Sequence, residues 1–254
     1  MCARVLTLLL FTLFVCAASE PIPLPPTSAG PAGKAPGRLL FVGNSFTYYN
    51  GGLENHVRQL AESADPPHRI TADRATKGGA TLKILHELKW VHDQIRTGGY
   101  DLVILQEDIP ELTEHSVEPF WEQARRFDRE IREIGGRTVL FMAWSYERLN
   151  WVTQEQIAKA HREIGKELGV SVAPVGLAFQ RAMKERPALA MLGRDKEHES
   201  IHGTYLAASV IYATIFGQSP KGLAYCPAGV SAEDAGFLQG IAWTTVREWQ
   251  QPLP

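Results

Sequence analysis

Cysteine is scarce in this chain of 254 residues, which contains three. Cys2 and Cys16 lie in the apolar N-terminal segment, so a folded domain that starts after that segment keeps one thiol, Cys226. A single thiol excludes an intramolecular disulfide, and the domain must be stable through its core alone. Cys226 stands in Tyr-Cys-Pro, far from any histidine-rich segment, and we expect it to be a loop residue rather than a nucleophile.

An excess of charge of either sign is also lacking. The formal net charge is -2, with 26 basic and 28 acidic residues. This balance gives no basic surface for nucleic acid and no polybasic segment for anionic lipid. The hydrophobic fraction of 44% is ordinary for a globular protein. We therefore expect a folded domain that does not bind nucleic acid.

The N-terminus has the features of a signal peptide, residues 1–19. A short positive region precedes the apolar run 5–17, and small residues follow it. The run is shorter than the roughly 20 residues of a membrane-spanning helix, so we expect no stable membrane span after cleavage. A retained helical anchor is one alternative. A lipoprotein at Cys16 is less favoured, because Phe14 and Val15 are bulky. The prediction is an exported protein, periplasmic or secreted.

Residues 20–37 form a proline-rich linker, with six prolines and almost no large apolar side chain. Such a segment buries too little surface to fold. The folded domain is then 38–254. It contains no internal repeat and no second linker, so the sequence predicts one domain.

Within this domain, short apolar runs alternate with helical patterns. The candidate strands are rich in Val, Ile and Leu and are bounded by Gly, Asp or Pro: 38–42, 68–72, 102–106, 138–143 and 170–174. The candidate helices have apolar residues three and four positions apart: 53–63, 81–95, 117–134, 154–168, 204–216 and 232–249. This alternation predicts a three-layer α/β/α sandwich with a mostly parallel, doubly wound sheet of about five strands.

A serine follows the first predicted strand. The sequence after Val42 is Gly-Asn-Ser-Phe-Thr, which places Ser45 at the carboxyl end of the strand, the sheet edge where ligands bind in α/β folds. This is not the Gly-x-Ser-x-Gly elbow of the α/β-hydrolases. A serine here caps a helix or acts as a nucleophile, and the second role needs a base and an oxyanion site.

Two later segments could supply oxyanion donors. Gly79 belongs to a glycine pair between a strand and a helix, where backbone N–H groups are exposed. Gln106 ends the strand 102–106 at the same edge as Ser45, and its carboxamide can donate without adding charge. Alone, the glycine pair is more typical of a tight turn before a helix, and Gln106 is also consistent with a polar cap of the sheet edge. Glu107 and Asp108 are expected to be solvated loop acids.

The candidate base is His198, with Asp195 three residues before it. An aspartate at this spacing can hold one ring nitrogen while the other takes a proton from serine. The segment 198–202 also reads His-Glu-Ser-Ile-His, the letters of a zinc-protease motif. That motif requires both histidines on one regular helix, whereas the apolar helical pattern begins only at Tyr205. Zinc binding by His198 and His202 is therefore the minor alternative.

Taken together, these segments resemble the blocks of the SGNH hydrolases, the GDSL-like esterases and lipases. Gly-Asn-Ser-Phe-Thr resembles the nucleophile block, Gly79 the glycine block, and residues 195–198 the Asp-x-x-His block. The family's Gly-x-Asn-Asp block is absent, and Leu-Gln-Glu stands in its place at 105–107. A branch with Gly-Asn-Ser-Phe and Leu-Gln blocks fits best.

The resemblance implies acyl transfer without a metal or other cofactor. Ser45 would attack an ester carbonyl, and His198 oriented by Asp195 would take its proton. The N–H groups of Ser45 and Gly79, with the Gln106 carboxamide, would hold the oxyanion. Residues proposed to line the pocket are Asn44 and Trp144.

The expected function is therefore an exported serine esterase. Export favours a carbohydrate substrate, such as one bearing O-acetyl groups, although a small-molecule ester is also possible. The alternative is a catalytically weak or silent domain that binds a glycan or other ligand on the same fold, and the missing Asn block motivates it. The sequence gives no oligomeric state.

Overall fold

The computed structural model describes residues 36–108 and 116–251. The predicted signal peptide and nearly all of the linker lie outside the described residues, so both stay predictions. Within the described part of the chain, no helix is both long and apolar enough to cross a membrane.

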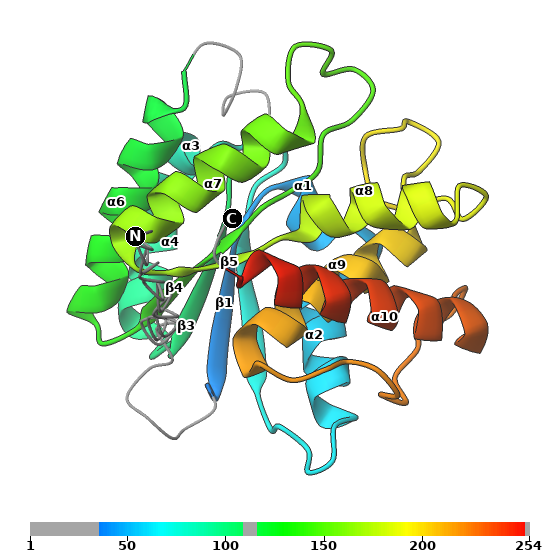
Figure 1. Ribbon diagram of the computed structural model, residues 1–254. Coiled ribbons are helices and arrows are strands. Elements are labelled where there is room, and N and C mark those ends of the chain that lie inside the picture. The colour runs from blue at the N-terminus through cyan, green and yellow to red at the C-terminus, as the bar shows by residue number, and fades with distance from the viewer. Residues whose placement is uncertain (1–35, 109–115, 252–254) are drawn as a thin grey trace, which may run out of the picture.

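The core is a five-stranded sheet in which every pairing is parallel (Figure 1). Its order is β2-β1-β3-β4-β5. The strands are β1 (Arg38–Gly43), β2 (Thr71–Thr76), β3 (Leu102–Gln106), β4 (Arg137–Phe141) and β5 (Ser171–Ala173). Strands β1 and β3 are almost wholly buried, as expected for parallel strands covered on both faces.

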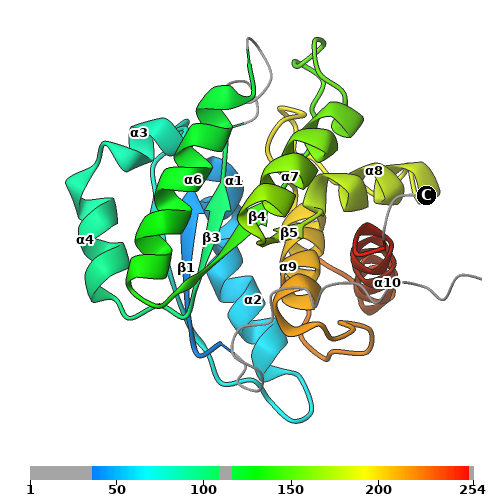
Figure 2. The same ribbon diagram turned by 60° about the vertical axis from the view of Figure 1, so that its left-hand side comes forward.

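Helices cover both faces of the sheet, and Figures 1 and 2 show α6 and α7 on one side with α2 and α9 on the other. Helices α3 and α4 pack with α6, while α10 packs on α8 and α9 as an outer layer. The helices are α1 (Ser45–Tyr48), α2 (Leu53–Glu62), α3 (Leu82–His86), α4 (Lys89–Thr97), α6 (Glu118–Glu133), α7 (Gln154–Leu168), α8 (Val175–Glu185), α9 (Ile201–Phe216) and α10 (Ala232–Trp249), with a 3-10 turn η1 (Tyr49–Gly51) after α1. The predicted three-layer α/β/α sandwich is confirmed.

The strand order places the nucleophile segment at a topological switch point. Strand β1 lies between β2 and β3. From β1 the chain passes to β2 on one side, and then crosses back to β3 on the other side. Crevices at such points, outside the carboxyl ends of the strands, are where open α/β sheets bind ligands. The register pairs Val42 with Leu105, so the residues that follow β1 and β3 emerge side by side.

Two sequence predictions of elements were wrong, and one helix was not predicted. Strand β2 begins at Thr71, not at residue 68, because this edge strand is polar and half exposed and gave no apolar signal. The helix predicted over 81–95 is two helices, broken where Leu88 adopts an extended conformation between α3 and α4. Helix α8 was missed.

Candidate active site

The nucleophile turn, residues 43–47, is held by its own asparagine. The Asn44 carboxamide oxygen accepts a hydrogen bond from the Phe46 N–H at 3.1 Å and caps α1. Its Nδ2 donates to Asp108 Oδ1 at 2.8 Å. Asn44 is buried and both ends of its amide are engaged. It therefore shapes the turn that carries Ser45, and the structure does not place it on an exposed pocket wall as expected.

Gln106 fixes the same turn from the neighbouring strand. Its Oε1 accepts from the Asn44 N–H at 2.9 Å and from Thr47 Oγ1 at 3.1 Å, and its Nε2 donates to the Glu107 carbonyl at 2.7 Å. The side chain is fully buried. A Cβ on Gly43 would lie 2.5 Å from Gln106 Oε1, which explains the glycine at this close approach. This geometry is at odds with the expected oxyanion role, because the amide faces inward and positions the turn.

The base loop, residues 195–198, is organised around the Asp195 carboxylate. Oδ1 accepts from the backbone N–H groups of Glu197 at 3.1 Å and His198 at 3.0 Å, and Oδ2 lies 2.8 Å from His198 Nδ1. The Glu197 N–H, followed by the His198 ring, holds the pKa of Asp195 below its usual range. The ionised carboxylate requires a proton on Nδ1, so Nε2 is the free base of the ring.

The free nitrogen of His198 lies against Ser45, the candidate nucleophile. His198 Nε2 lies 2.8 Å from Ser45 Oγ, although the two residues are 153 positions apart in sequence. The hydroxyl, imidazole and carboxylate form one continuous hydrogen-bonded chain of the kind that activates serine. The Asp195 side chain is 49% exposed and the His198 ring 21%, so the chain lies at the surface of the molecule.

The N–H groups of Ser45 and Gly79, expected as oxyanion donors, are not the ones that close the local cap and turn. The cap of α1 uses the N–H of Phe46, not that of Ser45, and the turn before α3 is closed by Ala80 donating to Lys77, not by Gly79. Gly79 has a φ of +62° and is exposed. A left-handed conformation favours glycine. With Gln106 facing inward, these two N–H groups are the ones that remain of the three oxyanion donors expected from the sequence.

The acids after β3 were expected in solvent, and the structure buries one of them. Glu107 Oε1 accepts from the Leu82 N–H at 2.9 Å and from the Asp108 N–H at 2.7 Å. Leu82 is the first residue of α3, directly after the Thr81 cap. Glu107 therefore ties the end of β3 to the helix that follows the Gly79 turn.

The loop after β4 binds the base loop through a hydrogen bond and an ion pair. Trp144 Nε1 donates to the Glu197 carbonyl at 2.9 Å, and Arg148 forms an ion pair with the Glu197 carboxylate at 3.0 Å. The Trp144 ring is buried and stacks on Phe179 with centroids 4.2 Å apart. Trp144 therefore supports the base loop from within the core and offers no exposed face to a substrate, unlike the expected pocket role.

The geometry does not unite His198 and His202 as zinc ligands. Helix α9 begins at Ile201, so His198 precedes the helix that the zinc motif requires, and both of its ring nitrogens are engaged. His202 instead lies 3.9 Å from Asp234. Within residues 36–108 and 116–251, no group of three or more His, Cys, Asp or Glu is arranged to hold a metal ion.

Sequence reasoning missed the aromatic ring that covers the base. Tyr49 stacks on His198 with ring centroids 4.1 Å apart and an interplanar angle of 9°, and it is 37% exposed. The segment after Tyr49 is Asn-Gly-Gly, a typical turn signal. That signal predicts a tight turn close to Ser45, although not the contact of Tyr49 with a residue far along the chain.

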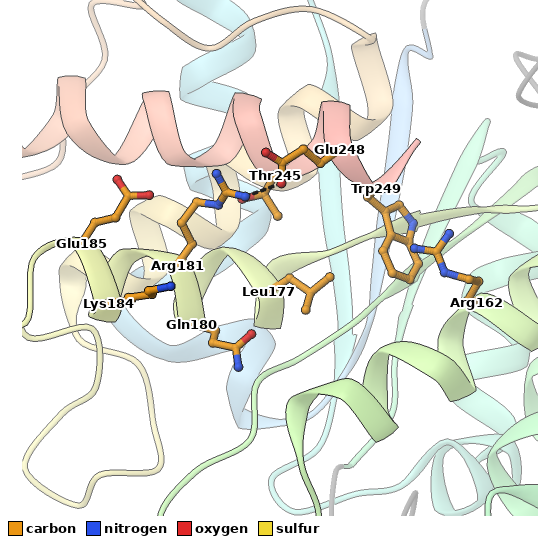
Figure 3. A pocket seen from close by; sticks show the side chains of 9 residues that line it. All are labelled: Arg162, Leu177, Gln180, Arg181, Lys184, Glu185, Thr245, Glu248 and Trp249. Carbon is orange, nitrogen blue, oxygen red and sulfur yellow. Dashed lines mark hydrogen bonds and ion pairs between the residues drawn. The ribbon is translucent and has the colours of Figure 1, made fainter. Parts of the chain in front are cut away.

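A separate hollow of about 630 Å³ lies between α7, α8 and α10 (Figure 3). Within its lining, Arg181 pairs with Glu248, and the Arg162 guanidinium lies 3.7 Å from the Trp249 ring centroid. Its lining includes no histidine, serine or cysteine. This hollow does not contribute to the serine chemistry.

No protein-family model and no curated protein sequence matches this chain. Solved structures do resemble it. A DUF4886 family protein from Bacteroides uniformis has a TM-score of 0.66 at 16% identity over 85% of this chain and 97% of its own. A Slackia heliotrinireducens protein assigned to the SGNH hydrolases has a TM-score of 0.60 at 19% identity, with 70% and 98% covered. The acetyl xylan esterase AlAXEase has a TM-score of 0.58 at 14% identity, with 70% and 99% covered.

The similarity extends over nearly the whole of each of these proteins, while the identities are low. It therefore bears on the fold and not on the activity. The resemblance predicted from the sequence blocks is confirmed at this level: the chain has the fold of the SGNH hydrolases.

Proposed function

We propose that this protein is an exported serine esterase that hydrolyses carboxylic esters through Ser45, His198 and Asp195. The observation that carries the proposal is the hydrogen-bonded chain with two contacts of 2.8 Å, from Ser45 Oγ to His198 Nε2 and from His198 Nδ1 to Asp195 Oδ2. Export rests on the N-terminal sequence.

The reaction follows from the proton positions. His198 Nε2 accepts the Ser45 proton while Ser45 Oγ attacks the carbonyl carbon, and Asp195 stabilises the imidazolium that forms. The negative charge that develops on the carbonyl oxygen is held by the N–H groups of Ser45 and Gly79. The imidazolium then gives its proton to the departing alcohol, and water attacks the acyl-enzyme with His198 again as the base.

The surroundings of the site favour an acyl group carried on a large alcohol. The base loop and the Gly79 turn are exposed, which suits an ester on the surface of a polymer. Tyr49 presents a partly exposed aromatic ring beside His198, a surface on which a sugar ring can stack. We therefore propose O-acetylated carbohydrate as the substrate class.

The test is acetate release from an acetylated polysaccharide and from a small aryl acetate by the purified protein. We expect hydrolysis of both, with loss of both in Ser45→Ala. Hydrolysis that persists unchanged in pure Ser45→Ala protein contradicts the proposal. Hydrolysis of the aryl ester alone contradicts the carbohydrate assignment and leaves the serine mechanism intact.

A domain that binds a ligand with little or no catalysis is the second candidate. The inward-facing Gln106 favours it, because the hole then lacks a side-chain donor. The loss of one oxyanion donor costs about 100- to 1000-fold in rate in a serine protease. Retained binding of the polysaccharide without acetate release supports this candidate.

A further inference from the structure

The segment that follows the nucleophile is bent into an unusual conformation. After α1, Asn50 has a φ of +49° and a ψ of +34°, in the left-handed region. In the part of the chain that the structure describes, Asn50 and Lys196 are the two non-glycine residues with positive φ. One follows Ser45 and the other lies in the base loop. Such outliers persist when surrounding contacts fix them, and they gather at functional sites.

The Asn50 side chain joins the nucleophile segment to the base segment. Its Nδ2 donates to the Glu199 carbonyl at 2.9 Å and to Thr204 Oγ1 at 2.8 Å. Glu199 directly follows His198, and Thr204 lies in the first turns of α9. Both amide protons of Asn50 are therefore used across a sequence gap of about 150 residues.

The Asn50 backbone is anchored from a third direction. His56 Nε2 lies 2.9 Å from the Asn50 carbonyl, and His56 Nδ1 lies 2.8 Å from the Tyr225 hydroxyl. The carbonyl can only accept, so Nε2 carries the proton and Nδ1 accepts from the tyrosine. Burial lowers the pKa of His56, which agrees with this neutral form of the ring. The turn is thus fixed to α2 and to the loop before α10.

The fixed turn places Tyr49 on the base. The Tyr49 N–H donates to the Ser45 carbonyl, and the Tyr49 carbonyl accepts from the Gly52 N–H at 2.9 Å. Between these two bonds, the ring lies parallel to the His198 imidazole at 4.1 Å. Residues 46–50, which follow Ser45, therefore hold the base segment at two points. Tyr49 packs on the His198 ring, and Asn50 binds the carbonyl of Glu199, the residue after His198.

We propose that Asn50 is a positioning residue that locks His198 to Ser45. The Asn50 amide, by holding the Glu199 carbonyl, keeps His198 Nε2 within hydrogen-bond reach of Ser45 Oγ, and the turn that it stabilises keeps Tyr49 against the imidazole. This role rests on the proposed serine esterase function. Its effect is on the geometry of proton transfer, because Asn50 does not touch the reacting atoms.

The test is Asn50→Gly in the full chain, since glycine adopts a φ of +49° freely and the substitution removes only the two side-chain bonds. We expect kcat for ester hydrolysis to fall about ten- to a hundredfold, with KM within about twofold, because small misplacements of catalytic groups cost rates of this order. The rate at which a fluorophosphonate modifies Ser45 should fall by the same factor. Asn50→Asp keeps the shape of the side chain but loses the N–H donor, and we expect the same fall in kcat. This variant replaces Asn50→Gly as the test if Asn50→Gly does not fold.

The matched control is Asn55→Ala. Asn55 Nδ2 donates to the Gly51 carbonyl at 2.7 Å, in the same turn, but it does not reach the base segment. We expect its kcat to stay within about twofold of the parent. The proposal is overturned if Asn50→Gly keeps the kcat of the parent protein, or if Asn55→Ala loses as much kcat as Asn50→Gly does.

A parent protein that neither hydrolyses esters nor reacts at Ser45 contradicts the proposed function instead. In that case, crystal structures of the parent and of Asn50→Gly test the role of Asn50 separately from the proposed function. A Ser45 Oγ to His198 Nε2 distance that lengthens beyond 3.5 Å in the variant supports the lock. A distance that stays at its parent value overturns it.

Discussion

The two halves of the candidate site are built in different ways. The nucleophile turn, residues 43–47, is held by buried hydrogen bonds from Gln106 and Asn44 to its backbone. The base loop, residues 195–198, lies at the surface, where Asp195 is 49% exposed and Arg148 pairs with Glu197 in solvent. Buried bonds cost much to leave unmade, whereas exposed ion pairs contribute little. Damage to the turn should therefore lower the free energy of unfolding, and damage to the loop should reduce activity with little change in stability.

The largest expected effect comes from the chain that joins the two halves. Ser45→Ala and His198→Ala should each lower kcat/KM for ester hydrolysis by at least about a thousandfold, and the double variant should lose no more than the worse single variant. The loss is shared because the two groups act in one proton transfer. Steady-state kinetics on all three variants is the check. Losses that multiply in the double variant would mean that Ser45 and His198 act independently.

The next effect tests the buried half. Gln106→Leu leaves the Asn44 N–H and the Thr47 hydroxyl without their acceptor. We expect the free energy of unfolding to fall by about 2 to 4 kcal/mol, measured by urea denaturation, because each buried unsatisfied group costs about 1–3 kcal/mol.

Gln180→Leu is the control for Gln106, since Gln180 bonds Glu155 at the surface of α8. It should change the free energy of unfolding by less than about 0.5 kcal/mol. An unchanged stability of Gln106→Leu together with a large loss of kcat would assign Gln106 to the oxyanion after all.

A smaller effect is expected at Glu199, which lies between the halves. The residue is 3% exposed, and burial raises the pKa of its carboxyl well above the usual value. Below pH 4 the group is protonated in both the folded and unfolded states. As the pH rises, the unfolded state loses its proton first, so this residue makes the fold less stable toward neutral and higher pH.

Glu199→Gln should therefore raise the melting temperature by a few degrees at pH 8 and leave it unchanged at pH 4. Glu163→Gln, at an exposed glutamate of α7, serves as the control and should show no such pH dependence. A stabilisation by Glu199→Gln that is equal at both pH values contradicts the assignment of a buried carboxyl with a raised pKa.

The smallest effect tests the exposed half. Arg148→Ala removes the ion pair to Glu197, in which the arginine side chain is 61% exposed. We expect kcat/KM to fall by about 1.4- to fivefold, corresponding to the roughly 0.2–1 kcal/mol typical of such pairs. The melting temperature should not change. Arg125→Ala removes another surface pair, with Glu167 between α6 and α7, in which the arginine side chain is 36% exposed, and its kcat/KM should match the parent. A large loss of stability in Arg148→Ala would mean that the base loop contributes to the stability of the fold as the buried nucleophile turn does.

The sequence predicted the sheet well where strands are buried. Leu102–Gln106 was predicted with its observed bounds, because a buried parallel strand is an unbroken apolar run. The polar edge strand β2 was misplaced, since solvent on one side removes that signal. Ser45 and Gln106 were predicted to lie at the same sheet edge, and the register that pairs Val42 with Leu105 brings the ends of their strands together. His198 was predicted to be the base for Ser45, and its Nε2 lies 2.8 Å from Ser45 Oγ.

Which way a side chain faces could not be predicted in the same way. Gln106 ends β3 and Trp144 follows β4, and at both positions an inward or an outward rotamer fits the local pattern. Their inward orientation depends on distant partners, such as Asn44 for Gln106 and Glu197 for Trp144. Asn50 was missed for the same reason, because its partners lie about 150 residues away.

The most direct test of the serine mechanism is reaction of the full chain with a fluorophosphonate, followed by peptide mapping. We predict one adduct, on Ser45, that forms at least about a hundredfold more slowly in His198→Ala, because the imidazole no longer takes the proton. A protein that hydrolyses esters but carries no adduct on Ser45, or carries it on another residue, contradicts the account.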